Sequence, residues 1–219
     1  MPSHIAPRAI LLRSRDNDHH ARELSQRIPD VDWVDVPMPA ELVGTAQTGD
    51  EQAQLHARLK RLIQSRKPAE LIVYSRAFGA FTSDARKALR ETLGTAVVSA
   101  PSAVLEDFDR MRARTIAVIT PYTAVRHDYE LSWLRDNNVR VVADVGLGHD
   151  IGAAITAIDY TDLLNQIDKM PQADAVYIAC TMISLHVLDR VQSLTKRHVI
   201  AATQSLVLAA SRELEQLRS

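Results

Sequence analysis

The sequence contains one internal repeat, and this repeat limits the possible folds more than any other feature. Residues Glu70–Arg76 align without a gap with Asp174–Cys180, and Thr95–Ser102 align with His198–Ser205. In both halves of the chain, short apolar runs alternate with segments of helical periodicity, which is typical of βαβ units. The repeat therefore predicts two regions of the same architecture.

Each half has four apolar runs that predict buried parallel strands. They are expected at Ala9–Leu12, Asp32–Pro37, Glu70–Ser75, Ala96–Ser99, Thr115–Thr120, Val139–Ala143, Ala175–Ala179 and His198–Ala202. With helices between them, the predicted fold class is α/β, in two pseudo-symmetric lobes that are each a four-stranded parallel sheet flanked by helices. We expect the lobes to be residues 1–112 and 113–219. Ligands of open α/β sheets bind at the carboxyl ends of strands, so the active site is expected in the cleft between the lobes.

Cys180 is the only cysteine of the chain, and it directly follows a predicted strand. Apolar residues recur at helical spacing over Leu185–Leu194, which predicts a helix that begins near Thr181. A helix N-terminus lowers the pKa of a thiol, so Cys180 is a candidate proton donor or acceptor near neutral pH. The alternative is an ordinary buried small residue. Arg76 occupies the same position in the other copy of the repeat, so the two side chains are expected to face each other across the cleft.

Composition and motifs argue against several classes of function. The formal net charge of the 219 residues is −1, so bulk charge gives no reason to expect binding to nucleic acid or to an anionic membrane. No apolar run approaches the ~20 residues of a membrane span, and no signal-peptide core is found, so a cytoplasmic location is expected. A single cysteine excludes an internal disulfide. His127 and His186 lack a partner at i+4, so no metal site is expected. The predicted loop that begins at Gly146–Gly148 departs from the G-x-G-x-x-G spacing of dinucleotide sites.

Several segments together resemble a known superfamily. They are Ala100–Leu105, Thr120–Thr123, Gly146–Gly148, Asp174–Thr181 and Ala202–Gln204. In order and spacing they resemble the aspartate/glutamate racemase superfamily, in particular its maleate cis-trans isomerase and arylmalonate decarboxylase branch. The resemblance implies two pseudo-symmetric lobes, an active site between them, no metal or organic cofactor, and one cysteine in each lobe.

The chain departs from this superfamily at the first of the two cysteines. Cys180 matches the second-lobe cysteine, but Arg76 stands where the first is expected, and the usual Thr-Ser pair is replaced by Ala77 and Phe78. Racemisation with two thiols is therefore disfavoured, and so is attack on an alkene by the first-lobe cysteine. The resembling decarboxylases use only the second-lobe cysteine. A single-thiol decarboxylase or one-base isomerase fits best.

The resemblance and the residues together predict the site and the reaction. The catalytic residues are expected to be Cys180 and Tyr122. The substrate-binding residues are expected to be Asn17, Arg76, Ala77, Phe78, Thr181 and Met182. Backbone N–H groups at the two strand ends would stabilise an enediolate-type intermediate formed from a small malonate- or maleate-like carboxylate.

Each of these residues also has a structural interpretation. Tyr122 could cap a strand, Arg76 could be a surface or lobe-bridging cation, Phe78 could be a packing residue, and Asn17 could cap a helix. The alternative to an enzyme is a catalytically degenerate member that binds a small carboxylate as a sensor or accessory protein. A homo-oligomer is expected in either case.

Overall fold

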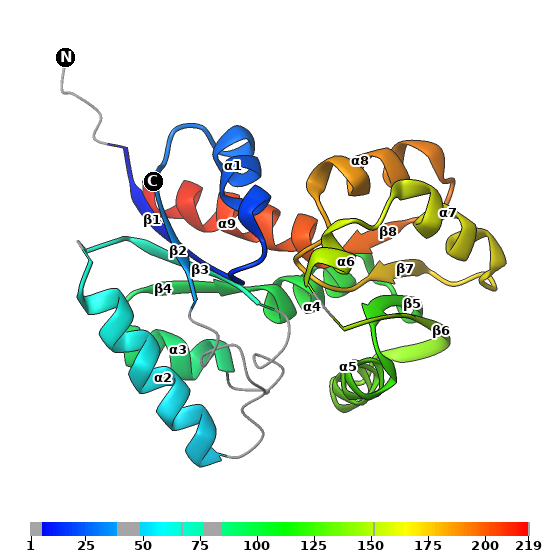
Figure 1. Cartoon of the computed structure of the whole chain (residues 1–219), viewed down its shortest axis with the longest axis horizontal. Coiled ribbons are helices and arrows are strands. Elements are labelled where there is room, and N and C mark those ends of the chain that lie inside the picture. Colours follow the sequence, from blue (N-terminus) through cyan, green and yellow to red (C-terminus); the bar gives the residue numbers. More distant parts are fainter. Residues whose placement is uncertain (1–5, 39–48, 67, 77–84, 151, 219) are drawn as a thin grey trace. The chain divides into compact units, whose positions relative to one another are not determined.

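The computed structural model describes residues 6–38, 49–66, 68–76, 85–150 and 152–218, and it contains two four-stranded parallel sheets (Figure 1). The strand order is β2-β1-β3-β4 in one sheet and β6-β5-β7-β8 in the other, so the two halves have the same topology. The strands are β1 Arg8–Arg13, β2 Asp32–Pro37, β3 Leu71–Ser75, β4 Ala96–Ser99, β5 Thr115–Tyr122, β6 Arg140–His149, β7 Ala175–Ile178 and β8 Val199–Ala201. The predicted α/β fold of two parallel sheets is thereby confirmed.

Helices connect the strands in every interval that the sequence predicted. They are α1 Asp18–Arg27, α2 Gly49–Gln64, α3 Ala85–Leu93, α4 Ala100–Met111, α5 Ala124–Asp136, α6 Gly152–Thr156, α7 Tyr160–Lys169, α8 Leu185–Leu194 and α9 Ala202–Arg218. No helix among the described residues is long and apolar enough to span a membrane.

The chain divides into two compact units, residues 1–99 with 206–219, and residues 100–205. This division assigns α4 to the second unit and most of α9 to the first. The boundary expected at residues 112 and 113 marks the sequence repeat, and it stays a prediction.

In the first unit, the sheet is covered on both faces. Figure 1 shows α2 and α3 on one face of this sheet and α1 on the other. Alternate side chains of the central strands, such as Ile10 and Ile72, form a cluster with Leu55, Leu59 and Leu89 of α2 and α3. Burial of these apolar side chains fixes the strand register and carries the carboxyl ends of β1 and β3 to the same edge of the sheet.

In the second unit, α5 lies on one face of the sheet and α7 and α8 lie on the other (Figure 1). Tyr177 of β7 points to the α5 face, where its ring packs edge-on against Phe108 of α4 with 5.6 Å between centroids. Tyr177 is among the largest fully buried side chains. Its hydroxyl therefore needs a partner inside the protein.

Strand β6 differs from its prediction. The sequence predicted a loop beginning at Gly146–Gly148, but β6 continues to His149, so that prediction is wrong. Gly146 pairs with Thr120, and an added Cβ at Gly146 would lie 3.1 Å from the Tyr122 carbonyl oxygen. The glycine thus serves close packing of β6 against the end of β5, instead of forming a turn.

Candidate functional site

Cys180 lies in a turn between β7 and α8, and not at the start of the helix. The helix begins at Leu185, and its N-cap Ser184 accepts a hydrogen bond from the Val187 N–H at 3.2 Å. The prediction of a helix that begins near Thr181 is therefore wrong. Apolar periodicity could not distinguish the two starts, whereas the serine cap selects the later one.

The backbone of Cys180 is held in an unusual conformation. Its φ angle is +80°, which residues with a side chain rarely adopt. The Thr203 hydroxyl donates to the carbonyl oxygens of Cys180 at 3.3 Å and of Ile183 at 2.9 Å, which ties this turn to the start of α9. Strain of this kind persists only where the surroundings impose it, and it concentrates at functional sites.

The thiol of Cys180 is buried, with 5% of the residue exposed. The Met182 N–H donates to Sγ at 3.4 Å, and Tyr122 shares a side-chain hydrogen bond with the thiol. Burial raises the pKa of Cys180 to about 11, although these two hydrogen bonds oppose the rise. The predicted lowering of this pKa is therefore wrong, because burial outweighs the two hydrogen bonds. At neutral pH, Cys180 carries its proton.

Tyr122 is the last residue of β5 and is buried beside Cys180. Burial raises its pKa well above 10, and the neighbouring Cys180 and Glu130 raise it further, so the phenol stays protonated as a hydrogen-bond donor. The structure brings together Cys180, Tyr122, Thr181 and Met182, four of the predicted site residues, in the second unit.

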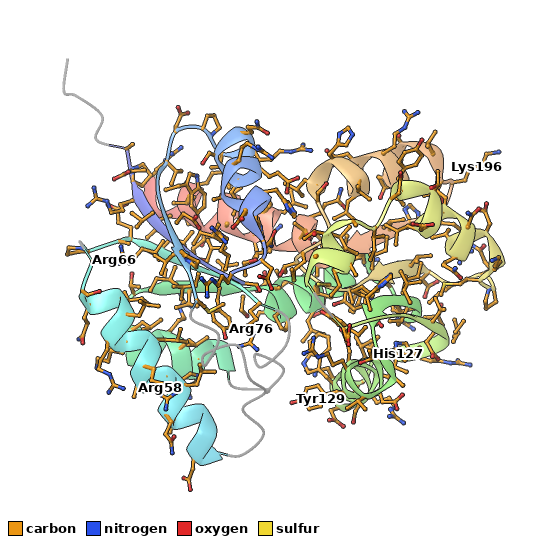
Figure 2. The ribbon with its side chains drawn as sticks, viewed as in Figure 1. Arg58, Arg66, Arg76, His127, Tyr129 and Lys196 are labelled. Carbon is orange, nitrogen blue, oxygen red and sulfur yellow. The ribbon has the colours of Figure 1, made fainter. Side chains whose placement is uncertain are left out.

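A histidine bridge fixes the end of β5 near Tyr122. His127 Nδ1 lies 2.8 Å from Thr120 Oγ1, and His127 Nε2 lies 2.9 Å from Asp144 Oδ1. His127 thus links α5 to β5 and β6. Figure 2 shows His127 and Tyr129 on different sides of α5. Among the described residues, no group of three or more His, Cys, Asp or Glu side chains is placed to hold a metal ion.

Glu130 was not predicted as a site residue, but it belongs to the same cluster. Its side chain is fully buried on α5, and Oε1 accepts a hydrogen bond from the Tyr177 hydroxyl at 2.7 Å. Burial raises the pKa of Glu130 from 4.5 to about 7, while the Tyr177 hydrogen bond lowers it. The sequence held one indication that Glu130 is buried, which is its spacing. Glu130 lies three residues from both His127 and Trp133, on the buried face of the helix.

In the first unit, a second polar cluster lies at the carboxyl ends of β1 and β3. His20 Nδ1 is 2.8 Å from Ser75 Oγ and 3.1 Å from the Asn17 amide nitrogen. Burial lowers the pKa of His20 to about 3, so this imidazole is neutral. His20 is fully buried on the inner face of α1. Asn17 is the α1 N-cap residue, but its side chain makes no cap hydrogen bond.

Arg76 directly follows β3, whereas Cys180 follows β7 after one intervening residue, Ala179. The side chain of Arg76 is buried and is labelled in Figure 2. Its guanidinium lies near the Tyr74 hydroxyl, and its positive charge opposes the rise that burial causes in the pKa of Tyr74. Ala77 and Phe78, which were predicted to bind substrate, lie outside the described residues. The roles of Asn17 and Arg76 toward a substrate stay predictions.

Comparisons with known proteins identify the relatives of this fold. The family model for arylmalonate decarboxylase matches residues 54–217. A comparison with curated protein sequences finds no match. The similar solved structures include the maleate isomerase from Pseudomonas putida with maleate, at 18% identity and TM-score 0.79, which covers 95% of this chain and 92% of that one.

Two further structures extend this likeness. Arylmalonate decarboxylase matches at 14% identity and TM-score 0.72, with 95% and 92% of the two chains covered. A mutant of the Nocardia farcinica maleate cis-trans isomerase with a covalently bound succinylcysteine intermediate matches at 15% identity and TM-score 0.80, with 95% and 93% covered. These structures have the same fold, and the family model covers most of the chain. The chain therefore belongs to the arylmalonate decarboxylase family.

Proposed function

We propose that this protein is a cofactor-independent decarboxylase of a small malonate-like acid, and that Cys180 delivers the proton to carbon. The observation that carries the proposal is the burial of the Cys180 thiol, which holds hydrogen bonds to Tyr122 and to the Met182 N–H and whose pKa burial raises to about 11. A thiol that holds its proton at neutral pH is suited to act as an acid toward a carbanion, and it is less suited to act as a nucleophile.

The reaction has two steps that this arrangement can support. The bond between the α-carbon and one carboxyl group breaks, CO2 leaves, and the electron pair stays on an enediolate. The proton of the Cys180 thiol then passes to the α-carbon, and the resulting thiolate recovers a proton from water. Tyr122 and the Met182 N–H, which already contact Sγ, would stabilise the thiolate while it exists.

A one-base isomerase of a maleate-like acid is the second candidate. The TM-scores of 0.79 and 0.80 with maleate isomerases favour it, because they exceed the 0.72 found with arylmalonate decarboxylase. The single cysteine and its raised pKa favour the decarboxylase, since addition to an alkene needs a thiolate.

An NMR screen in D2O tests the proposal. Malonates, 2-substituted malonates, maleate and 2-substituted acids are incubated with the protein. We expect loss of a carboxyl group from a malonate, with one deuterium at the α-carbon of the product. Conversion of maleate to fumarate would instead identify the isomerase. Binding of these acids without turnover of any of them would contradict both and identify a carboxylate sensor.

A further inference from the structure

We infer that Glu130 is a positioning residue which, by holding or releasing a proton, controls how readily the Cys180 thiol ionises. The inference rests on the proposed function in one respect, that the thiol acts through proton transfer. All the residues involved lie in the second unit.

The Glu130 carboxyl group lies in surroundings that disfavour its negative charge. The residue is fully buried, and Oε1 accepts the Tyr177 hydrogen bond at 2.7 Å. Among the residues that the structure describes, Oε2 has no hydrogen-bond partner. No cation forms an ion pair with this carboxyl group within the described part of the chain. A buried carboxylate without a cation is unstable, so its proton is retained to a much higher pH than usual.

Glu130 and the Cys180 thiol are linked electrostatically. The charge of Glu130 acts on Cys180, on Tyr122 and on Tyr177, and it raises the pKa of each of them. Arg126 of α5 also acts on the thiol, and its positive charge has the opposite effect. His127, on the same helix, is hydrogen-bonded to Thr120 and Asp144. Glu130 is thus a buried acid within the electrostatic reach of Cys180 that can change charge near neutral pH.

The protonation state of Glu130 changes how readily Cys180 gives up its proton in the reaction. When Cys180 gives up its proton, a negative charge forms on sulfur. Protonated Glu130 is neutral and does not repel this thiolate. Ionised Glu130 places a second negative charge near the thiolate in a medium of low dielectric, and the repulsion destabilises it. Protonated Glu130 therefore favours proton transfer from the thiol, and ionised Glu130 disfavours it.

The test measures the ionisation of the thiol without any substrate. Cys180 is the only cysteine, so mass spectrometry gives its alkylation rate by iodoacetamide directly. The rate is measured from mildly acidic to alkaline pH for the wild type, Glu130→Gln and Tyr177→Phe. Asp128→Asn is the matched control, because it removes an exposed carboxylate from the same helix.

We expect Glu130→Gln and the wild type to react at the same rate below the pKa of Glu130. Above it, the variant reacts faster by about three- to tenfold, the effect of removing one nearby negative charge. Tyr177→Phe removes the hydrogen bond that lowers the pKa of Glu130, so the step moves to higher pH. Asp128→Asn should follow the wild type throughout.

A ratio of rates that does not change with pH would overturn the inference, because a purely structural role alters the rate by the same factor at every pH. If Glu130→Gln fails to fold, Tyr177→Phe decides alone, and an unmoved step would overturn the inference. Failure to find a substrate would count against the proposed function only, since alkylation requires no substrate.

Discussion

The buried carboxyl group of Glu130 should make the stability of the protein depend on pH in a defined way. In the folded protein its pKa is about 7, against 4.5 for an ordinary glutamate. Glu130→Gln keeps the shape of the side chain and an oxygen that can accept the Tyr177 hydrogen bond, but it removes the titration. Comparison of this variant with the wild type isolates the one group, because all other titrating groups are shared.

The sign follows from which state holds the proton. Below pH 4.5, Glu130 is protonated in both the folded and the unfolded protein, and its full contribution to stability is present. Between pH 4.5 and 7 the unfolded chain releases the proton while the folded protein retains it, so the wild type loses stability relative to Glu130→Gln. Above pH 7 the difference is constant. The two pKa values differ by about 2.5, and at 1.36 kcal/mol for each pKa unit the total loss is about 3 kcal/mol.

Urea unfolding, followed by tryptophan fluorescence, measures this loss. The chain has two tryptophans, and Trp133 lies on α5, one helical turn from Glu130. A Trp33→Phe background for both proteins makes Trp133 the only emitter, so the signal reports the second unit. The gap in unfolding free energy between variant and wild type should widen by about 3 kcal/mol from pH 4.5 to 7.5. A gap that stays the same over this range would show that Glu130 titrates normally, and would refute the argument.

Three further predictions concern the candidate site. Tyr122→Phe should lower kcat more than it raises KM, because its hydroxyl contacts the thiol that changes charge; steady-state kinetics on the identified substrate decides this. Arg76→Ala should weaken carboxylate binding by about ten- to a hundredfold and Arg76→Lys should recover only part, as calorimetry can show; equal affinities would place Arg76 outside the site. Cys180→Gly should be more stable than Cys180→Ala by about 1 kcal/mol in urea unfolding, because φ is +80° at this position; the reverse order would mean that the turn is not strained.

The sequence predicted the fold well because the relevant signals are local. Strand β2 has the bounds that its alternating pattern predicted, Asp32–Pro37. Helix α7 begins with a local capping box, in which the Asp159 side chain accepts from the Thr161 N–H and Asp162 completes the box. The repeat also predicted correctly that Arg76 and Cys180 follow equivalent strands of two sheets of the same order.

The chemistry of the site was less predictable because it depends on residues that are distant in sequence. Tyr177 and Glu130 are separated by 47 positions, and neither residue alone indicates that a carboxyl group is buried against a phenol. The pKa of Cys180 depends on burial, which overrides any local helix effect. The burial of the His20 imidazole beside Ser75 likewise depends on the packing of α1 and not on a local sequence pattern.

In the proposed reaction, Cys180 supplies the proton that the carbanion takes up. The most direct test compares turnover of the wild type and Cys180→Ala on the substrate found by the NMR screen, with circular dichroism to confirm that both are folded. Loss of the only thiol should reduce turnover by at least about a hundredfold, the scale of general acid catalysis. If Cys180→Ala retains most of the activity, the thiol is a packing residue and the proton comes from elsewhere.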